Sequence, residues 1–227
     1  VESGAELRRF GGDLAQVNAV DLSADGRYAA SGSRDNAARL WDVRTGRQLR
    51  MLEGHTVSGE GRHGAEYGRK EGAGHSDRIS TAIFSPNGKH LITGSADGTA
   101  KVWDIESGEE LGSFPDYIPH LTAVTSIGLS PNGRYALLGY GRSHAQFYQV
   151  DTGERYSPLR GPNYESSDYP SEKYASYAVA YSGSSKYAMT AGAGWHDRGE
   201  GTVKLWQVST GEEIRTFEGN TSGIRDI

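Results

Sequence analysis

The chain of 227 residues contains no cysteine, two methionines and seven prolines. The lack of cysteine excludes disulfides, thiol catalysis and zinc sites with thiolate ligands. No window approaches the ~18 consecutive apolar residues of a membrane-spanning helix. The net charge of −5, from 24 Lys and Arg against 29 Asp and Glu, argues against a broad nucleic-acid footprint, because such a surface needs clustered cations.

Glycine is the residue that the chain has in excess. Its 32 copies are about twice the usual share of ~7%, which predicts frequent turns. Apolar and aromatic residues make up 35% of the chain, enough to bury a core. Because all-β domains often run to this length as one unit, the chain fits a single large domain.

An internal repeat organises almost the whole sequence. Residues 17–46 read VNAVDLSADGRYAASGSRDNAARLWDVRTG, and residues 79–108 read ISTAIFSPNGKHLITGSADGTAKVWDIESG. The same plan returns twice more, so the repeats span about 17–54, 79–114, 124–161 and 177–219. Longer connections at about 56–73 and 162–176 are interpreted as insertions, and residues 1–227 as one unit.

Each repeat predicts four short strands separated by turns. In the second copy, residues 79–84 alternate in polarity and end at Ser85-Pro86-Asn87-Gly88, a sequence that favours chain reversal. Strands at 91–93, 100–105 and 110–114 follow, each bounded by turn residues. No segment of the sequence keeps an apolar period of 3.6 residues, so we predict an all-β protein.

Tripeptides that recur in the repeats carry a family resemblance. Leu40-Trp41-Asp42, Val102-Trp103-Asp104 and Leu205-Trp206-Gln207, with the Gly54-His55 and Gly74-His75 pairs, resemble the WD-repeat β-propellers. The resemblance implies radially packed blades of four strands, as four full repeats with partial strands at both ends. Residues 6–10 match an outer strand and residues 223–227 an inner one. We therefore expect an incomplete ring, or part of a larger or dimeric propeller, that self-associates through exposed faces.

The resemblance also implies a hydrogen-bonded tetrad of His, Ser or Thr, Asp and Trp in each blade. The second repeat offers a complete set in His75, Thr93, Asp97 and Trp103. The other repeats offer partial sets: Ser31, Asp35 and Trp41 with Asp13 in place of the His; His120 with Leu138, Arg142 and Tyr148; and Thr190 and Trp206 with Glu200 near the Asp position. A His, hydroxyl and Asp combination is also typical of a catalytic triad. Its recurrence in register with the repeat favours the structural role.

The function that the resemblance implies is a non-catalytic scaffold that binds protein or peptide partners through one face of the propeller. The matching positions are Gln16, Asn18, Arg34, Arg78, Ser80, Thr125 and Tyr177. Tyr164, Tyr169 and Trp195, in the longer connections, are further candidates, because tyrosine and tryptophan are frequent at interfaces. Two alternatives stay open: an accessory propeller of a multidomain enzyme, and a glycan-binding propeller.

Catalysis, cofactors and metals find little support in the residues. Residues 59–64, GEGRHG, match a dinucleotide-binding pattern, but without the flanking strand and helix that such a site needs. His55, His63 and His75 lack a regular metal-ligand spacing. We predict no enzyme activity, cofactor, metal, nucleic-acid partner or membrane span, and either a homo-oligomer or blades from a longer chain to complete the ring. The compartment stays open between bacterial cytoplasm and periplasm.

Overall fold

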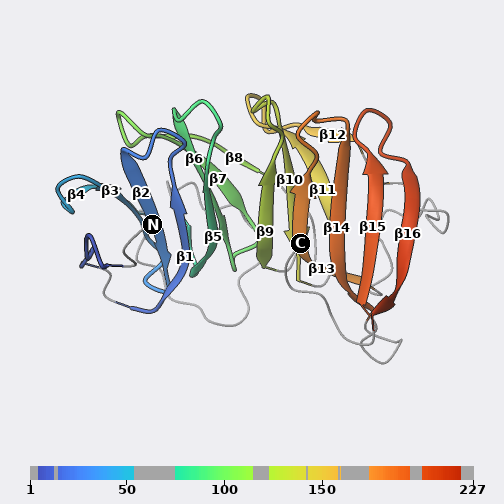
Figure 1. The fold of residues 1–227 in the computed structure, drawn as a ribbon, viewed down its shortest axis with the longest axis horizontal. Helices are drawn as coiled ribbons and strands as arrows, with labels where there is room; N and C mark the ends of the chain where they lie inside the picture. The colour runs from blue at the N-terminus through green and yellow to red at the C-terminus, as the bar shows by residue number, and fades with distance from the viewer. Residues whose placement is uncertain are drawn as a thin grey trace, which may run out of the picture.

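The computed structural model describes residues 5–12, 15–53, 75–114, 123–141, 143–157, 159, 174–194 and 201–220. Within these ranges every regular element is a β-strand (Figure 1). The strands form four antiparallel sheets of four strands each, and we call each sheet a blade. The prediction of an all-β protein is therefore confirmed.

The strands of each blade follow one another in sequence and in space. Blade 1 contains β1 (Val17–Leu22), β2 (Tyr28–Ser33), β3 (Ala38–Asp42) and β4 (Gln48–Leu52). Blade 2 contains β5 (Ile79–Phe84), β6 (His90–Ser95), β7 (Ala100–Asp104) and β8 (Glu110–Phe114). Blade 3 contains β9 (Val124–Leu129), β10 (Tyr135–Tyr140), β11 (Ser143–Gln149) and β12 (Arg155–Ser157). Blade 4 contains β13 (Tyr174–Tyr181), β14 (Tyr187–Gly194), β15 (Gly201–Gln207) and β16 (Glu213–Asn220), so β13 begins inside the predicted insertion.

The turn between the first two strands of a blade is built by local hydrogen bonds. In blade 2 the Ser85 hydroxyl donates to Asn87 Oδ1 over 2.6 Å and accepts the backbone N–H of His90 at 2.9 Å. Gly88 adopts a φ of +67°, a region that glycine enters without a Cβ clash. The predicted Ser85-Pro86-Asn87-Gly88 turn therefore joins two antiparallel strands.

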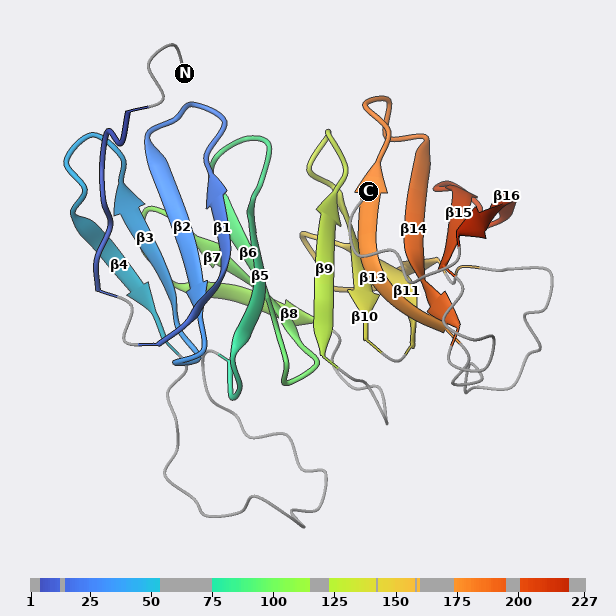
Figure 2. The same ribbon diagram turned by 60° about the horizontal axis from the view of Figure 1, so that its bottom comes forward.

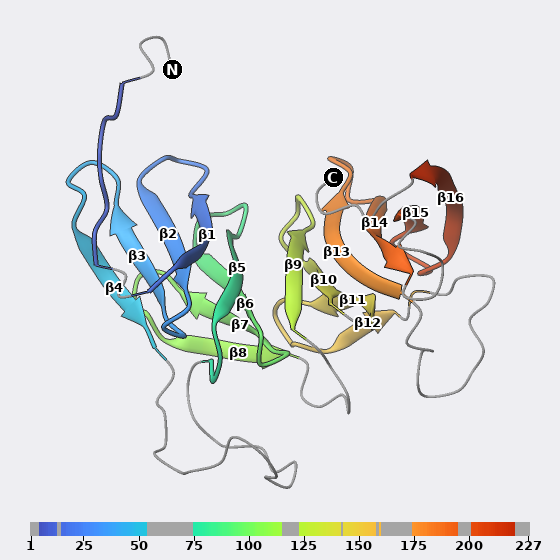
Figure 3. The same cartoon turned by 90° about the horizontal axis from the view of Figure 1, so that it is seen from below.

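The blades follow one another around an open arc (Figure 3). Their first strands, β1, β5, β9 and β13, lie along its inner side (Figure 2). An apolar layer fills each junction between neighbouring blades. The layer between blades 1 and 2, for example, contains Leu40 and Leu52 from one blade and Phe84, Leu91 and Trp103 from the next.

Glycines in the second strands allow this close packing. A methyl group added at Gly94 would stand 2.6 Å from Val124 Cγ1 and 2.8 Å from Thr81 Cγ2. A methyl group at Gly32 would stand 2.5 Å from Ile79 Cγ2. Since neither position can hold a side chain without movement, glycine sets the spacing between adjacent blades.

Polar side chains also link blade 1 to blade 2 and blade 2 to blade 3. Asn18 Nδ2 donates to the Ile79 carbonyl over 2.9 Å, and the Ser80 hydroxyl donates to the Val124 carbonyl. The backbone N–H of Phe84 donates to Asp21 Oδ2 over 2.7 Å. These bonds act together with the apolar layers, so adjacent blades are held in a defined orientation.

Candidate functional site

The complete tetrad of blade 2 is a buried hydrogen-bonded chain. Trp103 Nε1 donates to Thr93 Oγ1 over 2.8 Å, and Thr93 Oγ1 lies 2.7 Å from His75 Nε2. His75 Nδ1 lies 3.2 Å from Asp97 Oδ2. Because the Asp97 carboxylate can only accept, His75 donates to it through a proton on Nδ1. The structure thus brings all four side chains together across β6, β7 and the segment before β5.

The Asp97 carboxylate is held in its charged form. Burial raises its pKa, but the hydrogen bond and charge of His75 and two hydrogen bonds from Thr99 outweigh this effect, and the pKa falls to about 2. The backbone N–H of Ser76 also donates to Asp97 Oδ2 over 2.8 Å. Asp97 therefore fastens the β6–β7 turn to the chain that enters β5.

The same geometry excludes a catalytic role for this set. Thr93 has no exposed surface, and His75 and Trp103 are 2% and 3% exposed. The Thr93 oxygen, which would be the nucleophile of a triad, already accepts the indole N–H. A nucleophile must reach its substrate, so these residues do not form a catalytic triad.

Blade 1 builds its version of the set differently. Trp41 Nε1 donates to the Ser31 hydroxyl over 2.9 Å, as its counterpart does in blade 2. The Asp35 carboxylate, however, accepts hydrogen bonds from both terminal nitrogens of Arg39, over 3.2 and 2.6 Å. Asp13, expected at the His position, lies outside the described residues.

Blades 3 and 4 keep less of the pattern. In blade 4 Trp206 Nε1 donates to Thr190 Oγ1 over 2.9 Å. In blade 3 Leu138 stands in β10 at the hydroxyl position, and the buried hydroxyls of Tyr140 and Tyr148 lie 3.5 Å apart. Burial raises the pKa of both tyrosines, so both hydroxyls stay protonated. His120, Arg142 and Glu200 lie outside the described residues.

The predicted partner-binding residues divide into two groups. Asn18, Ser80 and Thr125 occupy equivalent places in β1, β5 and β9, and their side chains donate to backbone carbonyls of the molecule. The side chains of Gln16, Arg34 and Arg78 are exposed. The first group holds the fold together, and the second offers its polar atoms to solvent.

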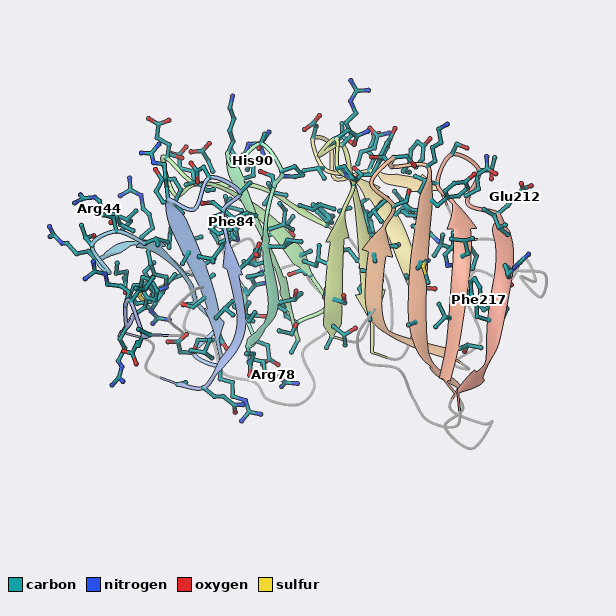
Figure 4. The ribbon with its side chains drawn as sticks, in the orientation of Figure 1. Arg44, Arg78, Phe84, His90, Glu212 and Phe217 are labelled. Atoms are coloured by element: carbon teal, nitrogen blue, oxygen red, sulfur yellow. The ribbon has the colours of Figure 1, made fainter. Side chains whose placement is uncertain are left out.

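The exposed group lies at one end of the blades. The backbone N–H of Arg34 donates to the Gln16 carbonyl over 2.9 Å, and the N–H of Ala96 donates to the Arg78 carbonyl over 3.0 Å. Gln16 and Arg78 thus precede the innermost strands of blades 1 and 2 in the same way. Figure 4 shows Arg78 at this end and His90 at the opposite one.

The remaining candidates cannot be placed by their side chains. Tyr177 belongs to β13, but its side chain is not among those described. Tyr164, Tyr169 and Trp195 lie outside the described residues.

One set of polar pairs was missed in the sequence. Lys101 Nζ lies 2.7 Å from Glu110 Oε1 in blade 2, and Lys204 Nζ lies 2.9 Å from Glu213 Oε2 in blade 4. In blade 3 the corresponding pair joins a charged residue to a neutral one, because Arg155 Nε donates to Gln146 Oε1 over 2.8 Å. The signal was available, because charged or amide residues recur at the same two places in the third and fourth strands of the second, third and fourth repeats.

Two further features are absent from the described residues. These ranges hold no group of three or more His, Asp or Glu that could ligate a metal. Nor does any helix of bilayer-spanning length and hydropathy occur in them.

Comparison with known proteins identifies the repeat. The family described as WD domain, G-beta repeat matches residues 4–42 and 69–104. A guanine nucleotide-binding protein subunit beta from Arabidopsis thaliana is 33% identical over 127 residues, covering 54% of this chain and 29% of that protein. The small ribosomal subunit protein RACK1 from Caenorhabditis elegans is 30% identical over 100 residues, covering 44% of this chain and 24% of RACK1. The chain thus spans less than a third of the length of these relatives.

A solved structure supports the fold. The crystal structure of the computationally designed Ika8 protein matches with a TM-score of 0.69 and 24% identity, over 97% of this chain and 54% of that one. At this identity the likeness concerns the fold alone. Residues 4–42 and 69–104 thus match WD repeats, and the four-stranded antiparallel blades have the architecture of a WD-repeat β-propeller.

Proposed function

We propose that this chain is a non-catalytic scaffold that binds protein or peptide partners at the end of the blades where the innermost strands begin. One observation carries the proposal. At this end Gln16, Arg34 and Arg78 are exposed, while the neighbouring Asn18 and Ser80 are bonded to the next blade. Polar groups on a rigid support lose little entropy when they bind, which favours recognition at this end.

The charge of the exposed residues indicates the chemistry of the partner. Arg34 follows β2 of blade 1 and Arg78 precedes β5 of blade 2, so the two arginines belong to adjoining blades. The neighbouring Asp77 carboxylate accepts the backbone N–H of Arg78 over 2.6 Å. Guanidinium groups bind carboxylates through paired hydrogen bonds. We therefore infer that the partner segment is extended and carries Asp or Glu side chains.

The names of the relatives support a binding role. They are called a guanine nucleotide-binding protein subunit beta and a small ribosomal subunit protein. Such names describe components of larger assemblies. For the present chain, the chemistry of the partner is inferred from its own exposed residues, Arg34 and Arg78.

A peptide-binding screen tests the proposal. Labelled peptides of random sequence, half enriched in Asp and Glu and half in Lys, would be screened by fluorescence polarisation against the chain. We expect the acidic set to supply the binders, and the double change Arg34→Glu and Arg78→Glu to weaken their binding at least tenfold.

Lys89→Glu is the matched control, because Lys89 is exposed beside His90 at the opposite end of blade 2 (Figure 4). Like each arginine change, this substitution replaces a positive charge by a negative one, but it does so away from the proposed surface. Binders that survive the double arginine change but are lost with Lys89→Glu would place recognition at the other end and contradict the proposal. All variants would first be shown to unfold at the temperature of the unaltered chain.

A further inference from the structure

The outward face of blade 1, on the side away from blade 2, is apolar and open. Val20 and Leu22 are 76% and 61% exposed there. Together with Phe10, Ala29 and Trp41 they line a groove of about 530 Å³. In blade 2 the corresponding side chains, which include Ala82, Phe84, Leu91 and Trp103, are buried against blade 1. The open face of blade 1 therefore carries the same kind of apolar side chains as a blade junction, but no described blade packs against it.

The segment 5–12 covers only the edge of this face. Arg8 Nη2 donates to the Arg44 carbonyl over 2.7 Å, and a methyl group at Gly46 would stand 3.2 Å from Arg8 Cδ. At the junction of blades 1 and 2, Arg50 Nη2 donates in the same way to the Glu106 carbonyl over 2.8 Å. Arg50 lies in β4, so segment 5–12 takes the place on blade 1 that an outer strand takes on the next blade. Phe10 completes the likeness, with its ring centroid 5.8 Å from that of Trp41.

Blade 4 carries the residues that such a junction requires. Arg215 in β16 is paired with Leu205, as Arg50 in β4 is paired with Leu40. Phe217 is paired with Val203, as Leu52 is paired with Ala38. Leu52 is 4% exposed in its junction, whereas Phe217 is 40% exposed. The outer face of blade 4 thus repeats the pattern of a face that receives another blade.

We propose that blade 4 of one copy of this chain docks on the open face of blade 1 of a second copy, with β16 replacing segment 5–12. Arg215 then donates to the Arg44 carbonyl that Arg8 occupies, and Phe217 covers Trp41 in place of Phe10. Arg44 and Phe217 lie at opposite ends of the molecule (Figure 4), so one chain cannot make this contact with itself. The proposed contact therefore joins two copies. Two copies joined at both ends form a closed dimer, whereas unclosed contacts form longer chains.

The first experiment measures the mass of the chain and of two face variants by analytical ultracentrifugation. Leu22→Glu places a charge on the open face of blade 1, and Phe217→Glu places one on the outer face of blade 4. Because the two side chains are 61% and 40% exposed and lie outside the blade junctions, both variants are expected to fold. Leu111→Glu, at a side chain that is 55% exposed in β8, is the matched control.

The proposal requires a specific pattern of association. The unaltered chain and Leu111→Glu should reach at least twice the 24.5 kDa of one chain. Each face variant alone should associate at least tenfold more weakly. An equimolar mixture of the two should regain a one-to-one complex, because one intact pair of faces remains between them.

Three results would overturn the proposal. A mixture that stays monomeric would exclude the pairing of blade 4 with blade 1. Association of Phe217→Glu as strong as that of the unaltered chain would mean that the blade 1 faces pair with each other. An unaltered chain that is monomeric up to high concentration would assign the open face to a blade of different sequence.

A second variant tests the exchange of strands. Arg8→Ala removes the hydrogen bond that holds segment 5–12 on the Gly46 turn, so we expect association to strengthen several-fold as β16 displaces the segment. Weaker association would show that segment 5–12 belongs to the interface, which would contradict the exchange.

Discussion

The carboxylate of Asp35 and the guanidinium of Arg39 form an ion pair in blade 1, with Oδ2 and Nη2 2.6 Å apart. The corresponding carboxylate of blade 2, Asp97, faces His75 instead. The Arg39 side chain is 1% exposed, and burying its charge is costly without a partner. Two blades of one chain therefore satisfy the same turn carboxylate with different nitrogen donors.

Removal of the Asp35 carboxylate should be strongly destabilising. We expect Asp35→Ala to lower the free energy of unfolding by about 3 kcal/mol, because it takes a carboxylate from a buried guanidinium. The double variant Asp35→Ala with Arg39→Met should lose less, since it removes both charges. Urea denaturation followed by tryptophan fluorescence measures both. A loss below about 0.5 kcal/mol for Asp35→Ala, as for an ordinary surface change, would show that the ion pair is not needed.

The hydroxyl of Thr93 is expected to contribute more to stability than the shape of its side chain. Thr93→Val keeps the volume but leaves the buried indole N–H of Trp103 without its acceptor, which should cost about 2 kcal/mol of unfolding free energy. Thr93→Ser keeps the hydroxyl and is the control. Equal stability of the two variants in urea denaturation would contradict the role of this hydrogen bond.

Much of the fold could be predicted because its signals are local. Turn residues such as Asn87 and Gly88 act within a few positions of the chain, and the alternation at the end of β5 places Ala82 and Phe84 on one buried face. The WD tripeptides then identified the blade that these strands form. Boundaries were less secure: β6 runs from His90 to Ser95, beyond the predicted 91–93.

The candidate site could be predicted less well, because its contacts depend on neighbouring blades. Asn18 and Ser80 are polar side chains near the start of innermost strands, a pattern equally typical of a partner contact and of a bond to the adjacent blade. Only the arrangement in space shows that both donate to the next blade. The Asp35 and Arg39 pair was missed for the same reason, since the resemblance directed attention to a histidine.

Acid should lower the free energy of unfolding through protonation of Asp97. Its pKa of about 2 lies below the ordinary value of 3.8. The folded state therefore binds this proton less readily than the unfolded state, so the carboxylate stabilises the fold fully above pH 3.8 and loses that contribution as the pH falls towards 2. The loss should be about 2 kcal/mol.

The measurement is the urea midpoint between pH 5 and pH 2 for the unaltered chain and for Asp97→Asn. The variant cannot titrate at this position, so its midpoint should fall less steeply over the same interval. Parallel curves would mean that Asp97 contributes nothing to the acid sensitivity.

The spacing of the blades should depend on Gly94 rather than on glycine content in general. Gly94→Ala forces a methyl group to within 2.6 Å of Val124 Cγ1, so we expect a loss of about 2 kcal/mol as blades 2 and 3 are pushed apart. Gly112→Ala is the matched control, because a methyl group there meets no atom of the described residues within 4 Å. Its stability should change by less than about 0.5 kcal/mol. Thermal and urea unfolding compare the two, and equal losses would show that the close approach of the blades at Gly94 can relax without cost.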